Sequence, residues 1–227
     1  MLMENESCDI NAKDENGRTA LHLATTAGHT ETANVILRES KCRINAADED
    51  GKTILQTATL AGQVHLVKFL VNKDCDFNAE YEDGRTALHF ALSMGHAGIA
   101  LLLIDGNHKS KADLRAKDNR GTTALIYTAY GLSSQLEEPL STGVSTSTEI
   151  NGNVPSLSAV SQVIFDHLIS EGGGTWEVDS DKETALHHAI SSSNEAAALC
   201  LLDYLNESIA ELVYNKPDSD LLLIRSC

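Results

Sequence analysis

The sequence predicts an all-α repeat protein, a solenoid of about five stacked helix-turn-helix units joined by short β-hairpin turns. A motif that reads Asn-Gly-Arg-Thr-Ala-Leu-His at residues 16–22 returns at 50–56, 83–89, 120–126 and 181–187. Successive copies start 34, 33, 37 and 61 residues apart, and a period near 33 residues is typical of stacked repeats. Aromatic residues make up only 4% of the chain, which suits thin helices packed through Ala and Leu.

Each copy of the motif predicts a turn that leads into a helix. Gly17 follows a polar pair, and this pattern is typical of turns that need a positive backbone dihedral. Thr19 then stands where a helix begins, with a side-chain oxygen able to cap free amide groups. The helix breaks at Gly28, and a second helix follows, with apolar residues three and four positions apart.

These residues resemble the ankyrin-repeat family. Residues 14–24, followed by Gly28 and His29, match that family's D-x-x-G-x-T-P-L-H-x-A…G-H line, with Ala20 at the proline position. The resemblance covers residues 8–130 and 157–206. It implies a fold of paired helices with projecting hairpins, and a function in protein–protein recognition.

The repeat pattern divides the chain into four parts. Residues 1–130 hold repeats 1 to 3 and the first helix of repeat 4, and residues 157–206 hold the rest of repeat 4 and repeat 5. Between them, residues 131–156 are rich in Ser and Thr and predict a disordered insertion, either a passive one, which we favour, or a regulatory loop. Residues 207–227 predict an irregular C-terminal cap or a truncated next repeat, because Leu221–Ile224 is too apolar to lie bare.

Charge and composition bound the partners and the location. The formal net charge of −16 argues against nucleic acid and anionic membranes as partners. Residues 1–120 hold 18 acidic and 14 basic residues, a net charge of −4, so residues 121–227 carry the remaining −12. A basic partner segment would complement this surface, although acidic residues also keep repeat proteins soluble. Without a signal peptide or an apolar run long enough for membrane insertion, we expect a cytoplasmic or nuclear protein.

The histidines and cysteines do not predict a catalytic or metal site. His22, His89 and His187 occupy the final slot of the motif, where the family uses histidine to hydrogen-bond between turns and neighbouring repeats. The chain has no C-x-x-C pair for zinc, and no phosphate loop, nucleophile elbow or paired-carboxylate cleft. We therefore expect no enzyme, no catalytic residue, no metal and no cofactor.

The resemblance also implies where a partner would bind. Partners of ankyrin arrays contact the hairpin tips and the exposed side of the first helices, which together form a concave face. The residues at these positions are Glu15, Asn16, Arg18, Thr26, Glu49, Asp50, Lys52, Leu60, Glu82, Asp83, Arg85, Ser93, Met94, Asn119, Arg120 and Thr122. Leu60 and Met94 are the candidates for an apolar interface centre, unless either turns inward.

The predicted function is a non-catalytic protein–protein interaction module. We expect a monomer that binds a protein partner, one carrying a basic segment, through the hairpin tips and the concave first-helix face. The alternative is the targeting or substrate-recognition arm of a larger enzyme or effector whose catalytic domain lies outside this chain.

Overall fold

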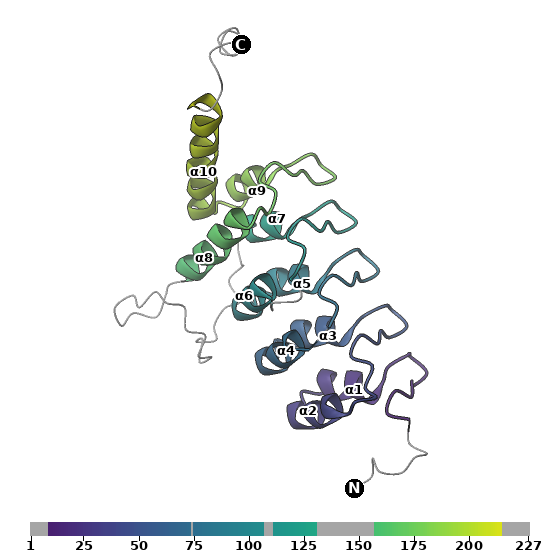
Figure 1. The fold of residues 1–227 in the computed structure, drawn as a ribbon. Helices are drawn as coiled ribbons and strands as arrows, with labels where there is room; N and C mark the ends of the chain where they lie inside the picture. The colour runs from purple at the N-terminus through teal and green to yellow at the C-terminus, as the bar shows by residue number, and fades with distance from the viewer. Residues whose placement is uncertain (1–8, 74, 107–110, 131–156, 215–227) are drawn as a thin grey trace, which may run out of the picture.

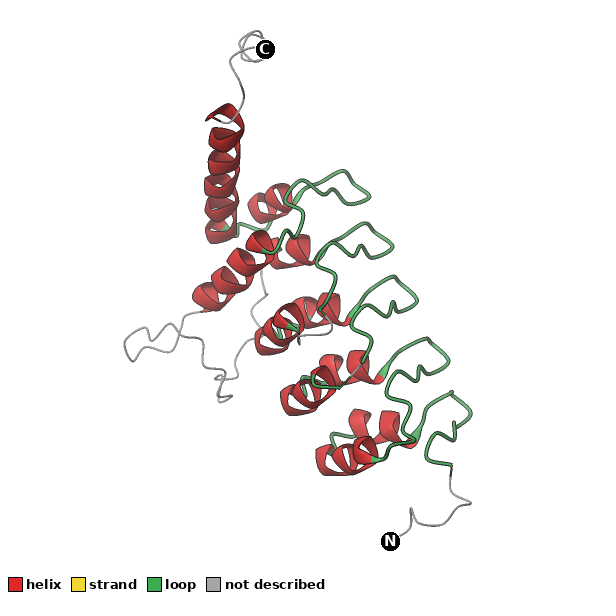
Figure 2. Cartoon of the chain, viewed as in Figure 1, coloured by secondary structure: helices red, strands yellow, loops and turns green. Residues whose placement is uncertain are grey.

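The computed structural model describes residues 9–73, 75–106, 111–130 and 157–214, and in these residues it is an all-α stack of helix pairs. Five hairpin arms project from one side of the stack (Figures 1 and 2). This confirms the predicted solenoid. The helices are α1 (Ala20–Thr26), α2 (Thr30–Arg38), α3 (Ile54–Leu60), α4 (Val64–Val71), α5 (Ala87–Ser93), α6 (Ala97–Asp105), α7 (Ala124–Ala129), α8 (Leu157–Ser170), α9 (Ala185–Ser191) and α10 (Glu195–Tyr214).

A reciprocal pair of hydrogen bonds starts the first helix of a repeat. In repeat 2 the Thr53 amide donates to Gln56 Oε1 at 2.9 Å, and the Gln56 amide donates to Thr53 Oγ1 at 3.3 Å. Two amides that a helix start leaves without partners are thereby satisfied. In repeat 1 the Thr19 amide bonds to His22 Nδ1 at 3.1 Å, so the same slot serves with histidine.

The same side chain also ties repeats 1, 2 and 3 to the repeat that follows each of them. His22 Nε2 lies 3.2 Å from the Lys52 carbonyl oxygen, and Gln56 Nε2 donates to the Ala79 carbonyl at 2.7 Å. His89 Nε2 lies 3.1 Å from the Ala116 carbonyl oxygen. These contacts agree with the structural role that the sequence predicts for His22 and His89.

The hairpin arms are held in line by backbone hydrogen bonds between their tips. The amide of Glu49 donates to the Asn16 carbonyl at 3.0 Å, and the amide of Asn119 donates to the Asp83 carbonyl at 2.8 Å. Apolar residues of both helices in each pair form one continuous core along the stack, in which Leu21, Leu55, Leu88 and Leu125 repeat the same buried position.

Two of the predicted segments fall wholly or partly outside the residues that the structure describes. The insertion at 131–156 lies outside them, as do residues 215–227. Helix α10 is one continuous helix as far as Tyr214, beyond residue 206 where the repeat pattern ends.

Two turn glycines allow a matched test of how closely neighbouring hairpins approach. Gly51 and Gly84 both have a positive φ, +79° and +77°. A Cβ on Gly84 would lie 2.7 Å from Asn119 Oδ1 and 2.9 Å from the Asn119 amide nitrogen, whereas a Cβ on Gly51 would meet nothing within 4 Å. Of these two glycines, Gly84 alone combines backbone strain with a clash.

We expect Gly51→Ala to lower the free energy of unfolding by about 1–2 kcal/mol, the cost of a left-handed backbone. Gly84→Ala should lower it by a further ~1–3 kcal/mol, because the hairpin of the fourth repeat must move. Urea unfolding followed by circular dichroism measures both values. Equal losses in the two variants would contradict the close approach of these hairpins.

Candidate functional site

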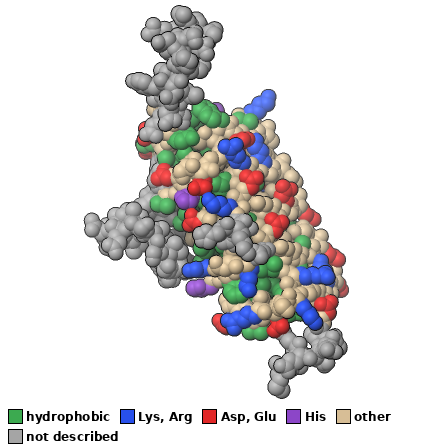
Figure 3. All heavy atoms as spheres, viewed as in Figure 1, with side chains coloured by type: hydrophobic (Ala, Val, Ile, Leu, Met, Phe, Trp, Pro, Cys, Tyr) green, Lys and Arg blue, Asp and Glu red, His purple; other side chains and the backbone are tan. Residues whose placement is uncertain are grey.

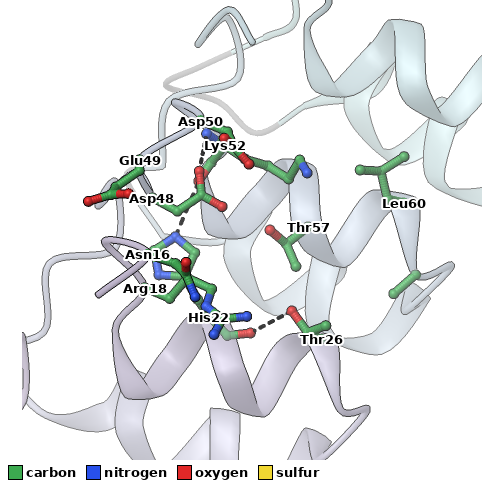
Figure 4. A pocket seen from close by; sticks show the side chains of 11 residues that line it. Asn16, Arg18, His22, Thr26, Asp48, Glu49, Asp50, Lys52, Thr57 and Leu60 are labelled. Carbon is green, nitrogen blue, oxygen red and sulfur yellow. Dashed lines mark hydrogen bonds between the residues drawn. The ribbon is translucent and has the colours of Figure 1, made fainter. Parts of the chain in front are cut away.

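A groove of about 470 Å³ lies between the first two repeats, below their hairpin tips and beside α1 and α3 (Figure 4). Its rim is charged and its floor carries hydroxyl and aliphatic groups. The lining residues are Asn16, Arg18, His22, Thr26, Asp48, Glu49, Asp50, Lys52, Thr57, Leu60 and Ala61.

The groove is open because Thr57 is small. Thr57 stands four residues after the capping Thr53, and its hydroxyl turns back to donate to the Thr53 carbonyl at 2.9 Å. The corresponding residue of repeat 3 is Phe90, which is 2% exposed and packs edge-on against Tyr81 of its own hairpin, with ring centroids 5.9 Å apart. A larger side chain thus fills, in repeat 3, the space below the hairpin that stays open in repeat 2.

Repeats 4 and 5 close the same space with hydrogen bonds. Tyr127 Oη donates to Asp118 Oδ2 at 2.9 Å, and His188 Nε2 lies 2.7 Å from Asp179 Oδ2. Burial raises the pKa of Tyr127, and the hydrogen bond to Asp118 adds to this effect. The phenol therefore stays protonated and keeps donating. The position of the groove therefore follows from the residue four positions after the capping threonine, which is small only in repeat 2 among repeats 2 to 5.

The cations of the first three hairpins are engaged within the array. Arg18 Nη2 lies 2.9 Å from Asp14 Oδ2, and Arg85 Nη2 lies 2.6 Å from Asp83 Oδ2. Lys52 Nζ lies 4.9 Å from the centre of the Tyr81 ring, the arrangement of a cation–π contact.

The acidic groups near these tips are not paired in this way. Within the described part of the chain, Glu15, Glu49, Asp50 and Glu82 form no ion pair with a Lys, Arg or His side chain. All of them except Glu82 belong to the first two hairpins, where the groove lies. The uncompensated charge at the groove rim is therefore negative.

The structure brings some of the predicted partner-binding residues together and leaves others apart. Those that line the groove are Asn16, Arg18, Thr26, Glu49, Asp50, Lys52 and Leu60. Those outside its lining are Glu15, Glu82, Asp83, Arg85, Ser93, Met94, Asn119, Arg120 and Thr122. The two apolar candidates separate: Leu60 is half-buried in the groove as the last residue of α3, whereas Met94 follows α5 as its C-cap and is 43% exposed.

Four lining residues were absent from the sequence prediction: His22, Asp48, Thr57 and Ala61. The signal for Thr57 was available, because aligning the repeats places Thr57 in the slot of Phe90, Tyr127 and His188, all of which are larger. The sequence predicts only a structural role for His22, whereas in the structure its imidazole also forms part of the groove wall.

A separate cluster of Asp179, Glu183 and His188 lies at the fifth repeat. Their potential ligand atoms lie within 4.8 Å of one another, which makes the cluster a group among the described residues that could hold a metal ion. The amides of Asp181 and Glu183 donate to Asp179 Oδ1, each at 2.9 Å, and His188 bonds to Oδ2. Burial alone would raise the pKa of Asp179, but these hydrogen bonds lower it overall.

This arrangement is the counterpart of the Tyr127–Asp118 bond one repeat earlier. It is explained by closure of the hairpin onto its helix, because the same slot and the same aspartate take part in both repeats. The absence of a metal site therefore stays a prediction.

Across the described residues, no helix combines the length and the apolar character needed to cross a membrane.

Comparison with known families bears on the same residues. A family model described as ankyrin repeats, in three copies, matches residues 1–81 and 63–137, which is more than half of the chain and includes the groove. No curated protein matches the chain.

The buried histidines make the stability of the array depend on pH. Burial lowers the pKa of His22 and of His89 below the ordinary value of 6.5, and hydrogen bonds to the Lys52 and Ala116 carbonyls oppose this only in part. The unfolded chain therefore binds more protons than the folded chain below pH 6.5, and stability falls as the pH falls. Gln56 occupies the same slot in repeat 2 and does not titrate.

We expect the free energy of unfolding to fall between pH 7.5 and pH 5.5, by at most ~1.4 kcal/mol per pH unit for each buried histidine. The double variant His22→Gln/His89→Gln should lose this part of the slope, whereas His65→Gln, an exposed residue of α4, should keep it. Urea unfolding at a series of pH values measures the slopes. Identical slopes in the double variant and the wild type would exclude these two histidines as the cause.

Proposed function

Because the chain belongs to the ankyrin-repeat family, we propose that it is a non-catalytic interaction module that holds a partner protein in the groove between its first two repeats. Ankyrin repeats are generally modules for protein–protein interaction, and domains built from them are typically non-catalytic. The observation that carries the proposal is the groove itself, which opens where Thr57 replaces the larger residues of later repeats.

The groove favours an extended segment of the partner with two kinds of side chain. An aliphatic or aromatic side chain fits against Leu60 and Ala61, which supply the apolar part of the lining. A Lys or Arg side chain fits the rim, where Glu49 and Asp50 have no cationic partner within the described residues. An apolar centre with a polar rim is the usual anatomy of a protein interface.

Binding in this proposal requires little change of shape. The capping slot and the tip-to-tip hydrogen bonds hold the groove walls from both sides, at Lys52 and at Glu49. Preformed interfaces of this kind move little on binding. The module acts as a monomer, and its place is the cytoplasm or nucleus, where the thiols of residues such as Cys42 stay reduced.

A pair of matched variants tests the groove. We expect Leu60→Arg to abolish capture of a specific partner from cell lysate, because it places a charge on the groove floor. Met94→Arg makes the same chemical change on the concave side but outside the groove, and it should leave capture unchanged. Quantitative mass spectrometry of the bound proteins compares both variants with the wild type, after circular dichroism shows that each one is folded.

The three outcomes of this comparison place the interface differently. Loss with Leu60→Arg alone supports the groove between repeats 1 and 2. Loss with Met94→Arg alone moves the interface to repeat 3 and contradicts the proposed site. Equal recovery of all bound proteins from both variants and the wild type excludes both positions.

A second prediction concerns charge. With the captured partner in hand, we expect its Kd to rise several-fold between 50 and 300 mM salt, because ions screen the rim carboxylates. The variant Glu49→Gln/Asp50→Asn should bind more weakly at low salt and show a flatter salt dependence. Titration calorimetry measures both effects. A Kd that is constant across this range would contradict a basic partner segment while leaving the groove in place.

A further inference from the structure

The last repeat exposes apolar side chains at positions that every earlier repeat buries. Ile190 stands six residues after the capping threonine of α9 and is 64% exposed. The equivalent residues of repeats 1 to 4 are between 0% and 1% exposed. They are Thr25, Thr59, Leu92 and Ala129.

The second helix of repeat 5 likewise exposes residues whose equivalents in the earlier repeats are buried. Leu202 on α10 is 43% exposed, whereas Leu37, Val71, Ile104 and Ile169 at the same position are between 1% and 8% exposed. Ala198, one turn earlier, is only partly buried, while Ala33, Val67, Ala100 and Phe165 are at most 2% exposed. These positions face the following repeat, because their side chains are covered wherever another repeat follows.

The hairpin arm does not show this contrast, because its corresponding position is exposed in repeats 2 to 5 alike. Asn11, Asn45 and Asn78 each accept a hydrogen bond from a backbone amide of the next repeat, at 2.8, 2.8 and 2.7 Å. Arg115 in repeat 4 likewise donates from Nε to the Gly172 carbonyl at 2.7 Å. In repeat 5 this position is Trp176, the chain's one tryptophan, which is 65% exposed, but Asn45, Asn78 and Arg115 are exposed too, so Trp176 does not belong to the surface that other repeats cover.

Together Ile190, Ala198 and Leu202 form an apolar surface that we call the end face. It spans the first and the second helix of repeat 5. A surface of this composition that is covered in every other unit favours an occupant over exposure to water.

We propose that the end face is the docking site of this chain's own segment Leu221–Ile224, which would cover the exposed apolar side chains of α9 and α10. Residues 215–227 lie outside the described residues, and their sequence and their reach support this occupant. The proposal is independent of the groove at the other end of the array.

The sequence of the segment matches the start of a repeat. Asp218-Ser219-Asp220-Leu221 aligns with residues 74–77, Asp-Cys-Asp-Phe, and with residues 111–114, Lys-Ala-Asp-Leu. Phe77 and Leu114 at the final position are 2% and 9% exposed and belong to the core of the stack. Leu221 thus has the residue type of a position that packs inward, and three further apolar residues follow it.

The segment is long enough to reach the end face. Leu202 lies twelve residues before Tyr214 on α10, a distance of about 18 Å along the helix. Residues 215–220 can span up to about 20 Å in an extended conformation. Because the segment is tethered, its effective concentration at the end face is in the millimolar range. A second copy of the chain or another protein that competes for this face rarely reaches such a concentration.

A double-mutant cycle tests the docking. The end-face variant is Ile190→Ser/Leu202→Ser, and the tail variant carries Ser at 221, 222, 223 and 224. We expect each to lower the Tm by about 2–4 °C or more, the shift that corresponds to ~1 kcal/mol in a chain of this size. The combined variant should lose no more than either alone, because both remove the same contact. Leu199→Ser is the matched control on an exposed part of α10 outside the end face, and it should leave the Tm unchanged.

Two further measurements use the same proteins. Hydrogen exchange of the α9 and α10 amides should be faster in the tail variant than in the wild type, and this comparison stands even if the end-face variant fails to fold. Light scattering after size exclusion should give a monomer for every variant.

Several results would overturn the proposal. Additive losses of Tm would show that the tail and the end face do not touch, and so would an end-face variant with the wild-type Tm. Unchanged hydrogen exchange in the tail variant would have the same meaning. A wild-type dimer that the end-face variant dissociates would assign the surface to a second copy of the chain.

Discussion

The order of the first three repeats depends on one hydrogen-bonding position near the start of each first helix, and each bonds onward to the next repeat. His22, Gln56 and His89 each cap their own helix with one side-chain atom and contact the following repeat with the other. A single side chain thereby both stabilises the start of its own helix and fixes the position of the next repeat in the stack. The chemistry tolerates exchange of imidazole for amide, because both groups offer two polar atoms at a suitable separation.

The groove shows how a repeating scaffold acquires a distinct site without an insertion. The backbone around Thr57 follows the same pattern as that around Phe90, with helix starts at matching positions and closely similar cap dihedrals. Only the side chain differs, and in repeats 3 to 5 that side chain closes the space below the hairpin through Tyr81, Asp118 or Asp179. The groove is present because Thr57 lacks the larger side chain that repeats 3 to 5 carry at this position. The carboxylates in the first two repeats, among them Glu49 and Asp50, then set the charge of that surface. Over the rest of this face of the array, acidic and basic side chains are interspersed (Figure 3).

The sequence predicted the fold and the general location of the site, because both follow from the period of the motif. The hairpin tips and first-helix ends recur at the same positions in each copy, so Asn16, Lys52 and Leu60 could be placed without a structure. The limits of the groove could not, because they depend on whether a side chain fills a gap between two elements. Met94 falls outside because the groove lies between repeats 1 and 2, where the equivalent C-cap residue of α3, Ala61, is part of the lining. The length of α10 was equally inaccessible, since no glycine or cap marks the end of the repeat pattern at residue 206.

The groove and the end face differ in how they tolerate water, and this difference assigns them different kinds of partner. Hydrated carboxylates such as Glu49 and Asp50 are stable at an open rim, so the groove can stand empty and exchange one partner for another. Fully burying an exposed Ile or Leu side chain contributes about 1.5–3 kcal/mol, and a cover over Ile190 and Leu202 would gain the share that corresponds to the 64% and 43% still exposed. A surface with that gain is best matched by a segment that never leaves, and a covalent tether supplies it at a small cost in loop entropy. The polar groove between repeats 1 and 2 therefore suits reversible recognition, and the apolar end face of repeat 5 suits a tethered occupant that stays in place.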